Sequence, residues 1–253
     1  MLGRRYFPDV AVEQTRGRPA AGVYQPTRRT DSNMFSLVAL LEQVAVDVSG
    51  DRVVSIGSAV IPAGGSRAAE GEPGLFDAGG VEYSFADVSG RRELQRGAPV
   101  MRYVAVPWWR NARLVVPPVM ISVLVAFAST LAAPFALFRR RRLDTRDRRL
   151  KAATRAALAA DLLAMIAALW LVLPASPMVV LESAAVVPIA MCIYALAWVG
   201  VLLAPMAVWG AGRAWRRRDG WFLLFRHTIE AGAAVVLALF LLVWRIAGTD
   251  LQF

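Results

Sequence analysis

Asp161, His227 and Glu230 are the side chains whose type and spacing could support chemistry. Asp161 stands alone in an apolar run, and a charge within a bilayer is costly and often marks a proton or ion pathway. Arg155 lies about two helical turns away, and we favour the structural alternative, a hydrogen bond within a helix bundle. His227 and Glu230 fall one turn apart, as a metal site or proton relay requires. They offer too few ligands for a metal, which favours a polar cap at headgroup level.

Motifs for a catalytic nucleophile are missing. A serine in a Ser-x-x-Lys motif needs the lysine one helical turn away to influence its proton. The single lysine is Lys151, and the residue three positions before it is Arg148. Gly-x-Ser-x-Gly and Lys-Thr-Gly are also absent, and the one cysteine, Cys192, cannot form a disulfide within the chain. We therefore predict no catalytic, cofactor-binding or metal-binding residue.

Long apolar runs carry the three polar candidates. Residues 114–138 contain no charged side chain, and about 20 apolar residues suffice to cross a bilayer core roughly 30 Å thick. Three further runs follow, at residues 156–173, 184–209 and 229–247. The pattern predicts a transmembrane region of four spans over residues 114–253.

Basic clusters between the runs predict their orientation. Residues 139–151 hold eight Arg and Lys side chains and residues 213–226 hold five, whereas residues 174–183 hold none. Short loops rich in Arg and Lys stay on the cytoplasmic side. We expect both basic loops inside, with the N-terminal domain and the C-terminus extracytoplasmic.

Composition agrees with a membrane protein. The hydrophobic content is 57%, above the roughly 45–50% of ordinary soluble domains. The net charge of +10 resembles a nucleic-acid signal. However, the cations cluster in loops between apolar runs, whereas nucleic-acid grooves interleave them with aromatic or base-reading side chains. No nucleic-acid partner is predicted.

The pattern changes to short strands over residues 22–106. Residues 44–48 and 81–85 are candidate strands with alternating residues, and residues 52–56 are a candidate return strand after the first of them. Residues 49–51 form a turn in the predicted hairpin. Residues 35–41 fit a strand or a helical turn, and residues 62–73 an irregular loop. We predict a small antiparallel, extracytoplasmic β-domain.

Two short segments complete the organisation. Residues 1–21 form a linker or N-terminal remnant. Residues 107–113 form an interfacial segment, because Trp108 and Trp109 precede the first span and tryptophan commonly anchors at headgroup level. We prefer this interpretation to a ligand-binding aromatic pair. The predicted fold class is an α+β membrane protein, with the small antiparallel β-domain followed by a four-helix transmembrane bundle.

A family resemblance rests on five short motifs and on their order along the chain. They are Tyr24-Gln25-Pro26-Thr27-Arg28-Arg29, Gly74-Leu75-Phe76, Pro107-Trp108-Trp109-Arg110, Arg226-His227-Thr228 and Trp244-Arg245-Ile246-Ala247-Gly248. Together they resemble the C-terminal accessory β-region and membrane region of bacterial membrane-bound serine hydrolases of the β-lactamase-related, penicillin-binding-protein-like family. The resemblance covers nearly the whole chain. That family's catalytic domain would lie before Met1, so the resemblance implies no catalytic residue here.

The resemblance implies a non-catalytic integral membrane protein, the C-terminal anchor and accessory β-domain of a truncated or split serine hydrolase. One alternative is a free-standing four-span membrane protein acting in sensing, transport or scaffolding. Another is a serine hydrolase with a misassigned start, so enzymatic activity stays open. The expected partners are the lipid bilayer and a serine hydrolase catalytic domain encoded upstream. The expected location is the bacterial inner membrane.

Overall fold

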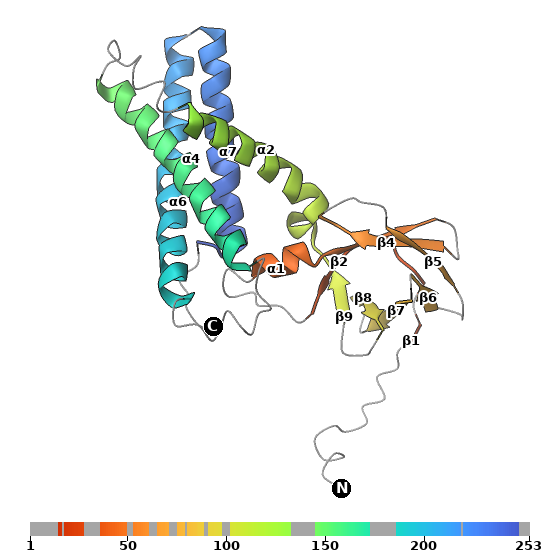
Figure 1. The fold of residues 1–253 in the computed structure, drawn as a ribbon. Coiled ribbons are helices and arrows are strands. Elements are labelled where there is room, and N and C mark those ends of the chain that lie inside the picture. Colours follow the sequence, from red (N-terminus) through yellow and green to blue (C-terminus); the bar gives the residue numbers. More distant parts are fainter. Residues whose placement is uncertain are drawn as a thin grey trace. The chain divides into compact units, whose positions relative to one another are not determined.

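The computed structural model describes residues 15–16, 18–27, 36–49, 53–60, 65–70, 75–78, 80–88, 91–97, 102–132, 145–172, 186–218 and 220–247. Its internal contacts divide the chain into two compact units. The first unit is Met1–Arg29 with Ala39–Leu114, and the second is Thr30–Val38 with Val115–Phe253. The strands belong to the first unit and the long helices to the second (Figure 1).

The first unit contains a closed antiparallel β-barrel. Its strands are β1 (Thr15–Arg16), β2 (Gly22–Pro26), β3 (Val44–Val48), β4 (Val53–Ser58), β5 (Ser66–Glu70), β6 (Leu75–Asp77), β7 (Glu82–Val88), β8 (Arg91–Arg96) and β9 (Arg102–Ala105). From β2 to β9 each strand pairs with the next, and β9 pairs with β2 to close the ring. The short strand β1 adds to β7. Closure removes the free edges at which an open sheet would pair with other chains.

Apolar side chains fill the barrel. Phe76 and Leu94 are fully buried, and the rings of Phe76 and Phe85 meet edge to face with their centroids 5.7 Å apart. Tyr24 packs against Phe85 and donates a hydrogen bond of 2.9 Å to the carbonyl of Ala20. An eight-stranded barrel is just wide enough for side chains to occupy its interior. The inward-facing residues of the strands therefore form the core of this unit.

The predicted strands at residues 44–48, 52–56 and 81–85 correspond to β3, β4 and β7. Of the two alternatives for residues 35–41, a strand or a helical turn, the structure shows a helix, α1 (Ser36–Leu41). The irregular loop predicted over residues 62–73 is wrong in part, because β5 pairs with β4 there. The buried residue of β5 is Ala68, and its small side chain produces no recognisable alternation of apolar and polar residues in the sequence of this strand. The predicted turn at residues 49–51 lies mostly outside the described residues.

The second unit contains four long apolar helices. They are α2 (Ala112–Leu131), whose first turn belongs to the barrel unit, α4 (Thr145–Val172), α6 (Val186–Arg217) and α7 (Trp221–Val243). Each is long and apolar enough to cross a membrane. Helix α6 packs against both α4 and α7, and α4 also contacts α7. The predicted fold class, an α+β membrane protein with a β-domain followed by four span-like helices, is confirmed.

The helices differ in length from the apolar runs. Helix α4 begins at Thr145 and α6 ends at Arg217, so both continue into the basic segments. Helix α7 begins at Trp221, eight residues before the predicted span at residues 229–247. Hydropathy marks only the apolar part of a helix, whereas backbone hydrogen bonding continues through polar residues. The last residues of the predicted span at 114–138 lie outside the described part.

Candidate functional site

Asp161 on α4 lies directly against Gly200 on α6. A Cβ atom added to Gly200 would lie 1.7 Å from Oδ1 of Asp161 and 2.5 Å from its Cγ. The carboxyl group thus occupies the space that the glycine leaves open. Asp161 is fully buried, and neither carboxyl oxygen has a hydrogen-bond partner among the described residues. The hydrogen bond that we expected within the bundle is therefore not observed.

This arrangement is chemically unusual. Burying a charged carboxylate without a compensating partner costs several kcal/mol in real proteins, and buried polar groups are normally hydrogen-bonded. Asp161 is therefore a buried carboxyl group on a span-like helix whose burial no hydrogen bond among the described residues compensates.

Glu230 on α7 is the centre of a second buried polar cluster, and it is well compensated. Its Oε1 accepts hydrogen bonds from Nε of Arg226 at 2.9 Å and from Oγ of Ser129 at 3.2 Å. Nδ1 of His227 lies 3.7 Å from Oε2. Ser129 belongs to α2, so the cluster joins α2 to α7 by a side-chain contact. The predicted proximity of His227 and Glu230 is confirmed.

The cluster lies deeper along its helix than we predicted. Because α7 begins at Trp221, nine residues or roughly 14 Å of helix precede Glu230. Helix α7 thus begins earlier than we predicted, and the polar cap at headgroup level stays a prediction. No group of three or more His, Cys, Asp or Glu side chains capable of holding a metal occurs among the described residues. The geometry is that of an ion pair within α7, which a hydrogen bond from Ser129 connects to α2.

Asp147 organises the basic end of the helices. It lies in the first turn of α4 and forms salt bridges with Arg217 and with Nε of Arg213, the latter at 3.6 Å. Both arginines belong to the last turns of α6. A cavity of about 210 Å³ adjoins these groups and is also lined by Lys151 and His227. The arginine-rich segments thus provide interhelical contacts as well as positive charge.

Gln43 joins the barrel to the beginning of α2. Its Nε2 donates to the carbonyl of Arg110 at 2.9 Å, and its Oε1 accepts from the backbone N–H of Ala112 at 2.9 Å. The first N–H groups of a helix have no partner within the helix. Gln43 is almost fully buried and supplies such a partner. One side chain therefore fixes the interfacial segment and the helix start to the barrel.

Asp47 on β3 provides a second link in the same unit. Arg113, in the first turn of α2, donates to both of its carboxyl oxygens, at 3.0 and 2.7 Å. These hydrogen bonds and the positive charge of Arg113 hold the pKa of Asp47 below its usual value. The pair is a bidentate ion pair, which fixes orientation as well as distance.

The predicted interfacial tryptophans are exposed. Trp108 is 77% exposed and Trp109 is 45% exposed, and they form a short helical turn, η2 (Trp108–Arg110), with Arg110. The guanidinium carbon of Arg110 lies 4.9 Å from the centre of a Trp109 ring. An exposed aromatic pair with an adjacent cation suits the membrane interface that we predict for this segment.

The sequence identified some members of these sites and missed others. Asp161 was identified as a candidate from the sequence, but only the packing of α4 on α6 brings it against Gly200. Arg226 stands four residues before Glu230, and this spacing was a usable signal for their ion pair. Ser129 and Gln43 gave no signal, because an isolated polar residue does not reveal its partner across 67 or more residues.

In comparisons with known proteins, no family model, curated protein or solved structure matches the chain. The structure itself supports a multi-pass membrane protein with an attached β-barrel.

Proposed function

We propose that this chain is a non-catalytic membrane anchor that carries its β-barrel as an accessory domain for a membrane-bound serine hydrolase of the β-lactamase-related family. The observation that carries the anchoring role is the double link made by Gln43 and Asp47. Together they attach the barrel to the first turn of a span-like helix. The hydrolase partner rests on the short sequence motifs alone, and the comparisons add no support to it.

The link is suited to positioning. A flexible linker would let the barrel reorient freely, whereas here a buried amide and a bidentate ion pair constrain the start of α2 within the barrel unit. The barrel is closed and its interior is packed, so its outer surface is the part left for a partner. The role that follows is to keep the barrel connected to the first turn of the membrane region through α2.

Photo-crosslinking in native membranes tests this role. A crosslinking amino acid at Arg67, an exposed residue of β5, should capture a protein that contains a Ser-x-x-Lys motif. The matched control is the same amino acid at Leu124, which is 63% exposed on the apolar helix α2 and should capture lipid instead. Capture of no such hydrolase from the barrel position would refute the proposed partner.

A second assay tests the non-catalytic part of the proposal. The purified chain should neither hydrolyse a chromogenic β-lactam nor become covalently labelled by a fluorescent penicillin. Labelling that maps to a serine of the barrel would show that the chain is itself a hydrolase.

Asp161 favours a second candidate function, a free-standing four-span protein that exchanges protons. The observation is its complete burial on a span-like helix without a hydrogen-bond partner among the residues that the structure describes. In proteoliposomes with an imposed membrane potential, the chain would acidify or alkalinise the lumen, and Asp161→Asn would abolish the signal. The control, Asp87→Asn, changes an exposed aspartate of the barrel. A flux equal to that of empty liposomes would eliminate this candidate.

A further inference from the structure

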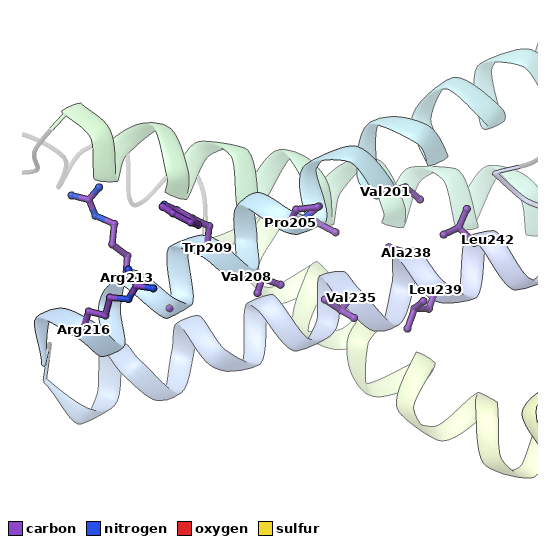
Figure 2. Close-up of a pocket in the computed structure, with 12 residues that line it drawn as sticks. Val201, Pro205, Val208, Trp209, Arg213, Arg216, Val235, Ala238, Leu239 and Leu242 are labelled. Atoms are coloured by element: carbon purple, nitrogen blue, oxygen red, sulfur yellow. The ribbon is translucent and has the colours of Figure 1, made fainter.

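An elongated cavity runs between α6 and α7, with a volume of about 610 Å³. Most of its lining is aliphatic, for example Val201 and Val208 of α6 and Leu239 of α7. Arg213 and Arg216 lie together at one end, where α6 approaches its C-terminus (Figure 2). The cavity is therefore amphipathic along its length.

The length of the cavity matches one leaflet of a bilayer. On α6 the lining extends from Val201 to Arg216, and fifteen residues of helix correspond to roughly 22 Å. One leaflet with its headgroup region measures roughly 20–22 Å, half of a bilayer about 40–45 Å thick. A molecule that fills the groove from the arginines inward would therefore reach about the middle of the membrane.

The charged end favours an anion. Asp147 engages Arg213 and Arg217 in salt bridges, but Arg216 is exposed and has no ion pair among the described residues. Lys151 lies with Arg213 and Arg217 around the neighbouring cavity, so the described linings of the two cavities hold one carboxylate, Asp147, and four Arg and Lys side chains. Arginine binds phosphate oxygens through charge-assisted hydrogen bonds. Basic pockets between membrane helices on the cytoplasmic side are suited to anionic lipid headgroups.

We propose that the groove between α6 and α7 is a binding site for one anionic phospholipid. Its phosphate lies at Arg213 and Arg216, and one acyl chain follows Val208 and Leu239 toward Val201. An apolar groove alone would accept any lipid chain, whereas the paired arginines select a headgroup with net negative charge. This site is independent of the barrel and of the partner proposed above.

Native mass spectrometry of the full chain in detergent tests the site. The probes are dioleoylphosphatidylglycerol and dioleoylphosphatidylcholine, which share their acyl chains and differ in headgroup charge. We expect retention of one phosphatidylglycerol in preference to phosphatidylcholine. Arg216→Gln should weaken phosphatidylglycerol binding roughly fivefold, the effect of one cation near an anionic headgroup, and leave phosphatidylcholine unchanged.

Arg218→Gln is the matched control, because Arg218 is exposed two residues further along and does not line the groove. It should leave the lipid preference intact. Leu239→Trp fills the groove from a residue that is 55% exposed and should reduce binding of both lipids, with folding verified by circular dichroism. Equal effects of the two arginine variants would overturn the headgroup assignment. Displacement of the lipid by glycerol phosphate alone at the same concentration would overturn the role of the groove.

Discussion

Substitution of Gly200 by alanine tests the close packing of α6 against Asp161 of α4. The new Cβ would lie 1.7 Å from Oδ1 of Asp161. That oxygen must retreat by roughly 1.8 Å to reach an ordinary contact distance of roughly 3.5 Å. Asp161 is fully buried between packed helices, so its carboxyl group has no solvent to turn toward. The helices must separate or the side chain must leave its preferred rotamer.

Such overpacking costs about 1–3 kcal/mol. Gly212→Ala on the same helix is the matched control, because a Cβ there meets no atom within 4 Å. Replacing glycine by alanine in an open helical position stabilises by roughly 0.5–1 kcal/mol. Both variants share this gain, so Gly200→Ala should be less stable than Gly212→Ala by about 1–3 kcal/mol, the cost of overpacking alone.

Reversible unfolding in mixed detergent micelles, followed by the fluorescence of the eight tryptophans, gives the free energy of unfolding. Repeating both substitutions in an Asp161→Ala background removes the colliding carboxyl group. The cost of Gly200→Ala should then largely disappear, which defines a coupling energy of about 1–3 kcal/mol between the two residues. Equal stabilities of the Gly200 and Gly212 variants, or an undiminished cost in the Asp161→Ala background, would refute the proposed packing.

Three further predictions concern the barrel and the orientation of the chain. Arg113 holds the pKa of Asp47 below its usual value of 3.8, so the pair stabilises the protein fully above that pH and its contribution is lost as the pH falls through the lowered pKa. Asp47→Asn should therefore flatten the acid-unfolding profile, by at most about 1 kcal/mol because the pair is exposed. Phe76→Ala should destabilise the barrel by about 3–5 kcal/mol in chemical denaturation, because it removes a fully buried ring; a smaller loss would mean that the core collapses around the gap. Reporter fusions after Lys151 and Ser176 should report the cytoplasm and the outside respectively, and the reverse result would contradict the orientation predicted from the basic loops.

The sequence predicted the fold class because both of its signals are local. Uninterrupted apolar runs indicate span-like helices, and alternation over residues 81–85 indicates a strand with one buried face. Closure of the barrel is different, because it depends on the pairing of β9 with β2, whose partners Tyr24 and Ala105 lie far apart in the chain. Strand β5 was missed because Ala68 occupies the core with a methyl group, which leaves no apolar pattern to recognise. Short strands of small residues are identified by their neighbours rather than by their own sequence.

The polar sites also divide into those with a local sequence signal and those that depend on distant partners. Arg226 and Glu230 are one helical turn apart, and their ion pair could be predicted from spacing alone. The contact between Asp161 and Gly200 required the register of two separate helices, which neither residue specifies. Gln43 was not recognised because its role is to complete the hydrogen bonding of a helix start 69 residues away.

Asp161 and Glu230, the buried carboxylates among the described residues, differ in how their burial is compensated. Glu230 receives hydrogen bonds from Arg226 and Ser129, so its burial is explained by the connection between α2 and α7. Asp161 is buried more completely and has no such partner among the described residues. An alanine at that position would fit beside Gly200 and would avoid the cost of an unsatisfied polar group, about 1–3 kcal/mol. This predicted gain in stability is the observation behind the second candidate function proposed above, reversible protonation of Asp161 inside the helix bundle.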